Sequence, residues 1–291
     1  MPTVSPPPRG LALVELVVAL VLTAVLAEAV YSVLLGSQRF YRAQAAVLEV
    51  HRGMRAAAQV LTAELRELDP AGGDVVALAP DSISIHASRR FAIVCAPPDP
   101  ASGRIVVADA LSFGFRAVDP ARDRALVFRE GDPTTADDDA WLDLAVASAT
   151  DGGAACADGA PGSAWVLAGA TAGLADVTVG SPVRTYERAV YRLYADGEGV
   201  WWLGVRTWSD GAWAAVSPVA GPLAPAAGLV FGYEDRHGSV TDDPRRIAGI
   251  TIAVRGVSEE QLQAAGGRQG RFVDSLVISV VPRNGRREVP P

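Results

Sequence analysis

Hydrophobic positions divide the chain into three stretches with different periods. From Leu11 to Leu35 almost every residue is apolar. From Ser37 to Leu68 apolar residues recur at steps of three and four, the spacing of one helix face. After Pro70 the period falls to two, which is typical of β-strands. The pattern predicts an α+β protein. One long N-terminal α-helix, transmembrane in its first half and amphipathic in its second, packs on a C-terminal antiparallel β-rich head.

The apolar stretch at residues 11–35 has the length of a membrane span. Its last twenty residues, Leu16–Leu35, would form about 30 Å of helix, which matches the hydrocarbon core of a bilayer. Tyr31, Phe40 and Tyr41 lie at or just past its far end, where interfacial aromatic residues gather. Arg9 on the near side favours a cytoplasmic N-terminus. We therefore predict a transmembrane segment over residues 11–35.

The second half of the helix, residues 36–70, is amphipathic. Only Gly53 interrupts a run of good helix formers, and Asp69-Pro70 predicts the end of the helix. We expect the apolar stripe of this half to pack on the protein's own sheet; the alternative is a coiled coil with a partner. His51, which lies in the stripe, is expected to be a packed core histidine and not a ligand. The stripe consists of Val47, His51, Met54, Ala58, Leu61, Leu65 and Leu68.

Residues 71–291 are expected to form the head from short strands separated by Asp, Pro and Gly turns. Ala189–Val216 has the clearest pattern, a three-stranded meander with turns at residues 196–199 and 209–211. Ser258–Ala265 predicts a short helix capped by Ser258. The other expected strands are Ser82–His86, Phe91–Cys95, Ile105–Val107, Leu111–Phe115, Ala125–Arg129, Leu229–Tyr233, Ile247–Arg255 and Phe272–Val281.

Charge and motif content exclude several kinds of function. The net charge of −7 argues against a protein that coats nucleic acid, so no nucleic-acid partner is expected. The sequence contains no lysine, which excludes a Walker A lysine and a Schiff-base lysine. His51, His86 and His237 match neither an HExxH motif nor a catalytic triad, and there is no GxSxG serine, P-loop or Rossmann fingerprint. We expect a protein that is not an enzyme and that has no cofactor.

The two cysteines, Cys95 and Cys156, are too far apart for a CxxC zinc or redox motif. In an extracytoplasmic head they would form one disulfide, and closing a loop of that length would contribute about 4 kcal/mol in the chain-entropy model. The alternative is two free thiols that are buried separately.

Two further groups of residues are candidate binding sites. Asp137, Asp138 and Asp139, with Asp132 and Asp143 nearby, carry the oxygen ligands that calcium prefers, but they lack the EF-hand spacing, and a solvated acidic turn is the favoured interpretation. No metal site is therefore predicted there. A second group of aromatic residues would form either a ligand platform or, as favoured, part of the core, because residues on a strand alternate between its two faces. This group is Trp201, Trp202, Trp208, Trp213, Tyr191 and Tyr194.

Glu15 is a carboxylate at the beginning of the apolar stretch, where burying a charge is costly. The nearest arginine along the sequence is Arg9. A cut between Gly10 and Leu11 would create an α-amino group about one helical turn before Glu15. That amine would be a counter-ion for the carboxylate, in the same chain or in a neighbour.

Gly10, Leu11, Glu15 and the apolar run after them resemble the type IV prepilin signal, whose short form is Gly-Phe-x-x-x-Glu. Leu11 departs from the usual phenylalanine. The resemblance implies that residues 1–10 are a leader that prepilin peptidase removes after Gly10. It also implies that Leu11 becomes the methylated first residue and that Glu15 serves in assembly. The partners would then be prepilin peptidase, other pilin or pseudopilin subunits and membrane lipid.

The segment from Pro222 to Gly256 also resembles the late part of PilW-like minor pilins and of the J-type minor pseudopilins of type II secretion. The resembling stretches read PLAPAAGLVFGYEDRHGSV and RRIAGITIAVRG. The implied function is a minor pilin or pseudopilin, a structural subunit of a type IV pilus or of a type II secretion-like filament. Such a subunit crosses the bacterial inner membrane once, with its N-terminus in the cytoplasm and its head outside, before it enters the filament.

Two other interpretations of the N-terminus and the head remain open. Ala27-Glu28-Ala29 follows the apolar core Leu16–Leu26 and fits a secretory cleavage site, so that the mature protein would begin at Val30. The competing function is a membrane-anchored or secreted β-rich ectodomain that acts alone as a ligand-binding module.

Overall fold

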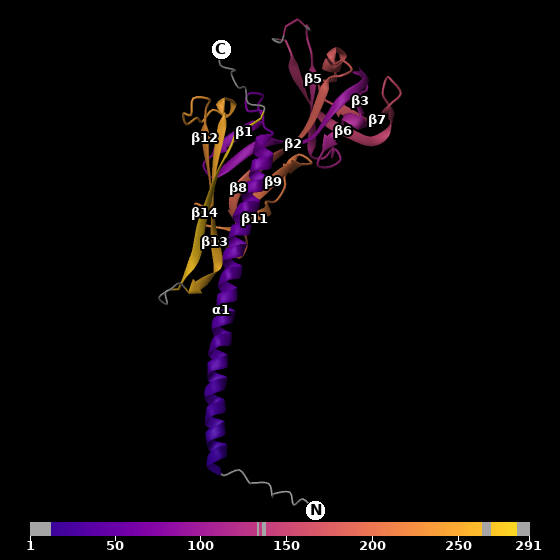
Figure 1. The fold of residues 1–291 in the computed structure, drawn as a ribbon. Coiled ribbons are helices and arrows are strands. Elements are labelled where there is room, and N and C mark those ends of the chain that lie inside the picture. Colours follow the sequence, from indigo (N-terminus) through magenta and orange to yellow (C-terminus); the bar gives the residue numbers. More distant parts are fainter. Residues whose placement is uncertain (1–12, 133, 136–137, 264–268, 284–291) are drawn as a thin grey trace, which may run out of the picture.

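A computed structural model describes residues 13–132, 134–135, 138–263 and 269–283. One long helix, α1 (Leu13–Arg66), precedes an antiparallel β-rich head, as the sequence predicts (Figure 1). Its 54 residues correspond to about 81 Å of helix. The C-terminal part of α1 lies against the head, and the N-terminal part extends away from it as a bare rod.

The strands of the described part of the chain pair into one continuous antiparallel sheet that bends into two lobes. Short 3₁₀ turns, η1 (Asp109–Leu111), η2 (Thr171–Asp176) and η3 (Pro244–Arg246), interrupt them. The strands are β1 (Val75–Ala79), β2 (Ser82–Asp99), β3 (Arg104–Ala108), β4 (Phe113–Gly114), β5 (Asp123–Arg129), β6 (Ala140–Ala155), β7 (Pro161–Ala168), β8 (Pro182–Ala195), β9 (Trp201–Ser209), β10 (Ala212–Trp213), β11 (Ser217–Leu223), β12 (Leu229–Glu234), β13 (Gly249–Gln263) and β14 (Gln269–Val280).

The first lobe carries the helix. Its strands follow the order β1-β2-β8-β9-β11-β13, and β13 also pairs with both β12 and β14. α1 packs across this sheet, mainly on β13, β11 and β14. The contact is an apolar core in which Leu61 and Leu65 of the helix meet Ile85, Leu203 and Ile252 of the sheet, all fully buried. The amphipathic half of α1 thus packs on the protein's own sheet, as expected.

The second lobe is a closed barrel of six strands. β2 pairs with β3, β3 with β7, β7 with β6, β6 with β5, β5 with β8, and β8 again with β2. A separate apolar core fills the barrel, with Trp165 of β7 fully buried among Ile105, Val127, Leu144 and Leu167. Closure leaves no open edge among these strands, because each has a neighbour on both sides.

β2 and β8 run through both lobes. They pair with each other over Ser82–Ile93 and Pro182–Arg192. At the helix-bearing end β2 also pairs with β1 and β8 with β9, whereas at the barrel end β2 pairs with β3 and β8 with β5. The two lobes therefore share a two-stranded spine, and no linker separates them.

Glycines allow the helix to lie close to the sheet. A Cβ added at Gly53 of α1 would lie 2.8 Å from the carbonyl carbon of Gly221 in β11 and closer still to its oxygen. A Cβ added at Gly256 of β13 would lie 2.6 Å from Cγ1 of Val50 and 3.0 Å from Cγ of Met54. The glycine that interrupts the helix formers in the sequence is thus a point of close backbone approach.

The structure corrects several sequence expectations. The predicted helix at Ser258–Ala265 is wrong: residues through Gln263 belong to β13, and the Ser258 hydroxyl donates to the Glu260 carbonyl and accepts from the Phe272 backbone N–H. Pairing with β14 provides this segment with a strand partner, which local sequence does not reveal. Ala264 and Ala265 lie outside the described residues.

Other corrections concern the ends of elements. Ser82–His86 and Phe91–Cys95 belong to one continuous strand, β2, and Leu111–Phe115 contributes only the two-residue β4. The sequence does not predict β1, β6, β7 or β11. α1 ends at Arg66, two residues before the predicted Leu68, although Leu68 is buried as the stripe predicts.

Candidate functional site

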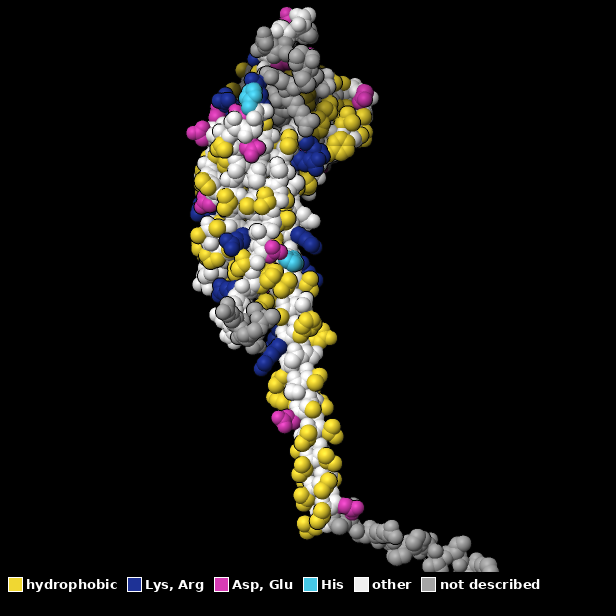
Figure 2. Space-filling view, turned by 60° about the vertical axis from the view of Figure 1, so that its left-hand side comes forward, with side chains coloured by type: hydrophobic (Ala, Val, Ile, Leu, Met, Phe, Trp, Pro, Cys, Tyr) yellow, Lys and Arg dark blue, Asp and Glu magenta, His cyan; other side chains and the backbone are white. Residues whose placement is uncertain are grey.

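The bare part of α1, Leu13–Glu49, is the most unusual surface of the molecule; we call it the arm. The first buried residue of the helix is Val50, and exposed apolar side chains predominate over residues 13–34 of the arm on the face that Figure 2 shows. The helix is long and apolar enough to cross a membrane, a property that a signal sequence shares. Its exposed large apolar residues include Leu16, Leu20, Leu22, Leu26, Val30 and Leu34.

The residues of the prepilin-like motif lie at the free end of the arm. Gly10 and Leu11 are outside the described residues. Glu15 lies in the first turn of α1, where a carboxylate interacts favourably with the positive end of the helix dipole. The distance along the helix from Glu15 to Glu64, which lies within the head, is about 74 Å. Chemistry at the N-terminus is therefore remote from every feature of the head.

Where the arm nears the head, four consecutive residues are exposed: Arg39, Phe40, Tyr41 and Arg42. The two aromatic rings lie edge to face with their centroids 6.2 Å apart. No carboxylate among the described residues lies within 4.0 Å of either guanidinium. We call these four residues the arm patch.

The apolar stripe of α1 is wider than the sequence predicts at its beginning. Val50, Gly53 and Ala57 are buried in addition to the expected Met54 and Ala58. The expected stripe residue Val47 is only partly buried.

His51 lies at the margin of the stripe, and the expectation of a core histidine is wrong in this respect. Its ring packs edge to face on Phe272 at 5.8 Å between centroids. Its Nε2 lies 3.0 Å from Oδ2 of Asp274, so the residue joins the helix to β14 and remains partly exposed.

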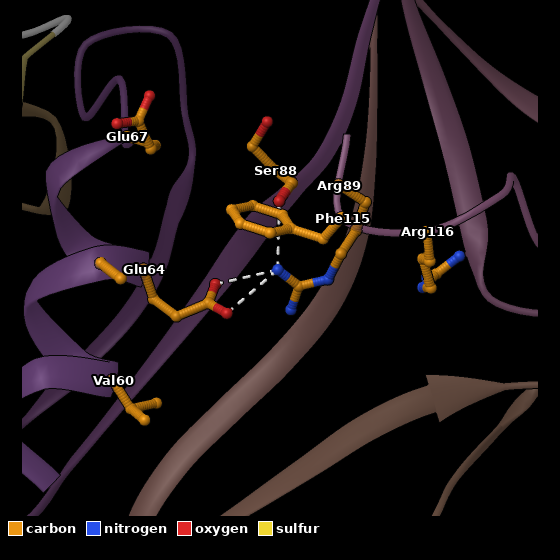
Figure 3. Close-up of a pocket in the computed structure, with 8 residues that line it drawn as sticks. Val60, Glu64, Glu67, Ser88, Arg89, Phe115 and Arg116 are labelled. Carbon is orange, nitrogen blue, oxygen red and sulfur yellow. Dashed lines mark hydrogen bonds and ion pairs between the residues drawn. The ribbon is translucent and has the colours of Figure 1, made fainter. Parts of the chain in front are cut away.

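A chain of five charged residues joins the helix to both lobes. Arg89 of β2 donates two hydrogen bonds from Nη1 to the Glu64 carboxylate, at 3.0 and 3.1 Å (Figure 3), and one from Nη2 to Glu187 of β8 at 3.0 Å. Arg116 binds the other oxygen of Glu187 at 2.8 Å and both oxygens of Asp123 at 2.6 and 2.7 Å. Burial lowers the pKa of Arg89, but the charges of Glu64 and Glu187 outweigh this effect and raise the pKa above its usual value. The guanidinium therefore remains charged.

A pocket of about 350 Å³ lies over this chain, between α1 and the loop after β4 (Figure 3). Val60 and Ala63 of the helix and Phe115 of the loop form its apolar walls, while Glu64 and Arg89 meet across it. Phe115 is 85% exposed, and Phe113 and Leu111, two and four residues before it, are 63% and 48% exposed. We call this the junction pocket.

The described acidic residues near position 137 mainly stabilise a loop by accepting backbone hydrogen bonds. Asp138 accepts a hydrogen bond from the backbone N–H of Asp132, and Asp139 accepts one from Gly131. Asp143 lies on β6, where it binds Arg124 and accepts a hydrogen bond from the Tyr186 hydroxyl. Asp137 is outside the described residues. Within the described ranges, no three acidic, histidine or cysteine side chains are placed to share a metal ion.

The expected aromatic group does not form one surface. Tyr191 is buried in the core under the helix, and Trp201 packs against that core. The indole N–H of Trp202 donates to Asp196. Trp208 and Trp213 lie edge to face at 5.4 Å, and the Arg188 guanidinium lies 4.8 Å from the Trp208 ring. Strand alternation separates these side chains, as the packing interpretation requires.

Cys95 of β2 and Cys156, just after β6, are joined by a disulfide. The backbone N–H of Ala157 donates to the carbonyl of Cys95, so the two segments are also joined through their main chains. The bond closes a loop across strands of the barrel, with a sequence separation of 61.

Sequence reasoning missed the junction pocket and its charged chain. Arg89 is 25 residues from Glu64 and 98 from Glu187, so no local spacing reveals these pairs. It also missed the pair between Asp74 and Arg184, in which both carboxylate oxygens accept hydrogen bonds from the guanidinium. The one local sign was the apolar triplet Leu111, Phe113 and Phe115, which was interpreted as a strand.

No family model, curated protein or solved structure matches this chain.

Proposed function

We propose that the chain is a minor pilin or pseudopilin, a structural subunit of a type IV pilus or of a type II secretion-like filament. The observation that carries this proposal is the arm. Its first part, residues 13–34, is almost wholly apolar and exposed, and it continues without a break into a helix half that is fixed by the head. A long helix packed on a β-rich head is the arrangement that the resemblance to pilins implies, and it supports the same proposal.

The continuity of α1 favours a subunit over a simple anchor. A protein that only needs attachment to a membrane functions equally well with a flexible linker between the span and the head. Here the apolar core under Leu61 and Leu65 fixes the helix to the sheet. Axial movement of the arm therefore moves the head with it.

The apolar surface of the arm has two environments in this proposal. In the inner membrane it lies in lipid, with the N-terminus in the cytoplasm and the head outside. In the filament it lies against the arms of neighbouring subunits. Lipid tails and packed apolar side chains solvate such residues about equally well, so the transfer requires little loss of burial.

Processing makes the arm ready for assembly. Prepilin peptidase removes residues 1–10 after Gly10, and the amine of the methylated Leu11 then lies about one turn before Glu15. Charge compensation between this carboxylate and an N-terminal amine favours one register among the neighbouring arms.

N-terminal mass spectrometry of the membrane-extracted protein tests the proposal. We expect the mature chain to begin at Leu11 and to carry a methyl group. A chain that begins at Val30 would instead identify a secreted ectodomain, the competing function. A chain that retains Met1 would contradict filament assembly.

A substitution at Glu15 tests assembly separately. Glu15→Ala is expected to be processed normally but to enter sheared filaments poorly, whereas Glu198→Ala, in an exposed turn of the head, is expected to enter them as the parent does. Equal incorporation of the two variants would contradict the role of Glu15.

A further inference from the structure

The strand β14 has an open edge beside the helix. Among the described strands it pairs with β13 alone, so the backbone groups on its other side have no strand partner. The Phe272 N–H donates to the Ser258 hydroxyl of β13, and the direction of these groups alternates along a strand. The N–H groups of Ser275, Val277 and Ser279 therefore point away from β13.

The first half of this edge is protected, and the second half is not. The Asp274 carboxylate accepts a hydrogen bond from the Ser275 N–H, so it occupies one of the outward donors. From Leu276 to Val280 the sequence is LVISV, without the charge, proline or bulge with which natural edge strands prevent pairing. Val277 is 62% exposed. Such an edge is suited to bind an extended chain as an added strand, which is called β-augmentation.

A groove lies between the unprotected edge and one flank of α1. Leu276 and Ile278 form its strand side, and Ala58 contributes to its helix side. The segment after β14 lies at one end of the groove, where the Arg283 N–H donates to the Arg66 carbonyl. The polar residues of the helix side are Arg55, Gln59, Thr62 and Arg66. A further strand on β14 would therefore lie along this polar flank.

The polar flank determines the charge of the occupant. No carboxylate among the described residues lies within 4.0 Å of the guanidinium group of Arg55 or Arg66. The described residues that line the groove include no acidic side chain. Asp274, the one acidic residue of β14, already binds His51. Two cations without an ion-pair partner at one groove favour an acidic occupant.

The spacing of the two arginines fits the repeat of a strand. Arg55 and Arg66 are eleven residues apart, or about three helical turns, so they lie on one helix face about 17 Å from each other. Side chains on one face of a strand that are six residues apart are separated by about 20 Å. A seven-residue strand with an acid at each end therefore reaches both arginines.

We propose that an extended acidic segment of a different protein binds in this groove as an additional strand on β14. Its backbone pairs with Val277 and Ser279, and its acidic side chains approach Arg55 and Arg66. Its alternate side chains face away from the helix, beside the exposed Val277. This binding requires only the head and does not depend on entry into a filament.

A second copy of the chain does not suit this edge. Its own β14 carries a single carboxylate, which cannot neutralise both arginines. Two β14 strands would pair symmetrically only about a two-fold axis perpendicular to the sheet. Since α1 runs alongside β14, that axis would point the two arms in opposite directions, whereas copies anchored in one membrane have their arms in the same direction (Figure 1). The occupant is therefore a different protein.

Peptide binding to the full chain in detergent micelles tests the groove. The probe is the fluorescein-labelled heptapeptide Glu-Val-Thr-Val-Thr-Val-Glu. One control peptide has arginine in place of both glutamates, and another has N-methyl groups at all internal residues. We expect the anisotropy of the probe to rise to saturation, and neither control to bind at up to about 1 mM. Hydrogen exchange should show that the bound probe protects the amides of Val277 and Ser279.

Variants of the groove test each part of the contact. Arg55→Glu and Arg66→Glu should each weaken binding of the probe about fivefold or more, whereas Arg192→Glu, at an exposed position of β8, should leave it unchanged. Val277→Pro removes an outward N–H but no hydrogen bond to β13. The head of this variant should therefore unfold at the same urea concentration as the parent, while the probe no longer binds.

The outcomes decide the proposal. Charge-dependent binding with protection of Val277 and Ser279 supports it. The absence of saturable binding, protection of other amides, or binding that is indifferent to Arg55 and Arg66 overturns it. Protection of β14 that rises with protein concentration without peptide identifies a second copy as the occupant and also overturns it. Each of these failures leaves the filament function intact, because that function is tested at the N-terminus.

Discussion

The close approach of Gly53 and Gly221 provides the sharpest test of how the helix is seated on the head. In Gly53→Ala the new methyl group meets the carbonyl of Gly221, which belongs to the backbone of β11 and has no rotamer to change. Ordinary carbon contacts lie at about 3.5–4.0 Å, so the helix and the strand must separate by roughly 1 Å.

The size of the effect follows from the contacts around Gly53. Val50, Met54 and Ala57 are buried on the same face, and a gap of this size removes about a quarter to a half of the dispersion energy of each contact. Forced overpacking of this kind costs up to about 3 kcal/mol, and the better helix propensity of alanine offsets about 1 kcal/mol. We expect a net loss of about 2 kcal/mol in the free energy of unfolding.

Urea unfolding of the full chain in detergent micelles measures this loss. The sequence has 6 tryptophans, and all of them lie in the head, so their fluorescence reports head unfolding. Gly36→Ala is the matched control, because it lies in the same helix where an added Cβ meets nothing within 4 Å. If Gly53→Ala and Gly36→Ala unfold at the same urea concentration, the helix is not seated against β11 as described.

Three further predictions concern the head. Arg89→Met leaves the Glu64 carboxylate without its ion-pair partner, so it should lower the free energy of unfolding by about 3 kcal/mol in the same urea titration. The control Arg192→Met, at an exposed position, should change the free energy of unfolding little. Joint replacement of Cys95 and Cys156 by serine should lower the free energy of unfolding by about 4 kcal/mol, and a reducing agent added to the parent protein should cause the same loss. If neither change has an effect, the loop is not cross-linked. Burial and the neighbouring Asp143 charge raise the pKa of Tyr186 to about 12, so stability that is present below pH 10 should decline as the pH rises from about 10 to 12. Tyr186→Phe should reduce that decline in thermal unfolding, and an unchanged alkaline profile would contradict this assignment.

The sequence predicts the helix well because the evidence for it is local. Periodicity, good helix formers and Asp69-Pro70 locate α1 to within two residues at its C-terminal end. The expected stripe residues Met54, Ala58, Leu61 and Leu65 are buried, since a helix face is determined by spacing alone. The role of Gly53 was not predictable, because it depends on Gly221, far away in sequence.

Strands were predicted where β-branched and aromatic residues alternate and missed where composition conceals them. β6 reads AWLDLAVASATDGGAA, rich in alanine and glycine, and is held as a strand by β5 and β7. The segment SEEQLQ, with its good helix formers, is nevertheless part of β13 because β14 pairs with it. In both cases tertiary pairing overrides local propensity.

The closed barrel and the charged chain could not be derived from spacing. The barrel depends on β8 returning to both β2 and β5, and Glu187 in that strand reaches Arg89 and Arg116 only because of this return. The candidate residues of the N-terminus differ in this respect. Gly10, Leu11 and Glu15 were identified from local sequence, and their roles remain predictions.

The spine of β2 and β8 has a mechanical consequence. Both strands pass from the sheet beneath the helix into the barrel, and they pair along this whole length with a single shift of register between Ser88 and Arg90. A pull on the arm is thus transmitted through the helix into the sheet and loads the β2–β8 ladder along its length, so that many bonds resist together. The barrel should therefore move together with the helix as one rigid body when the arm is extracted from a membrane.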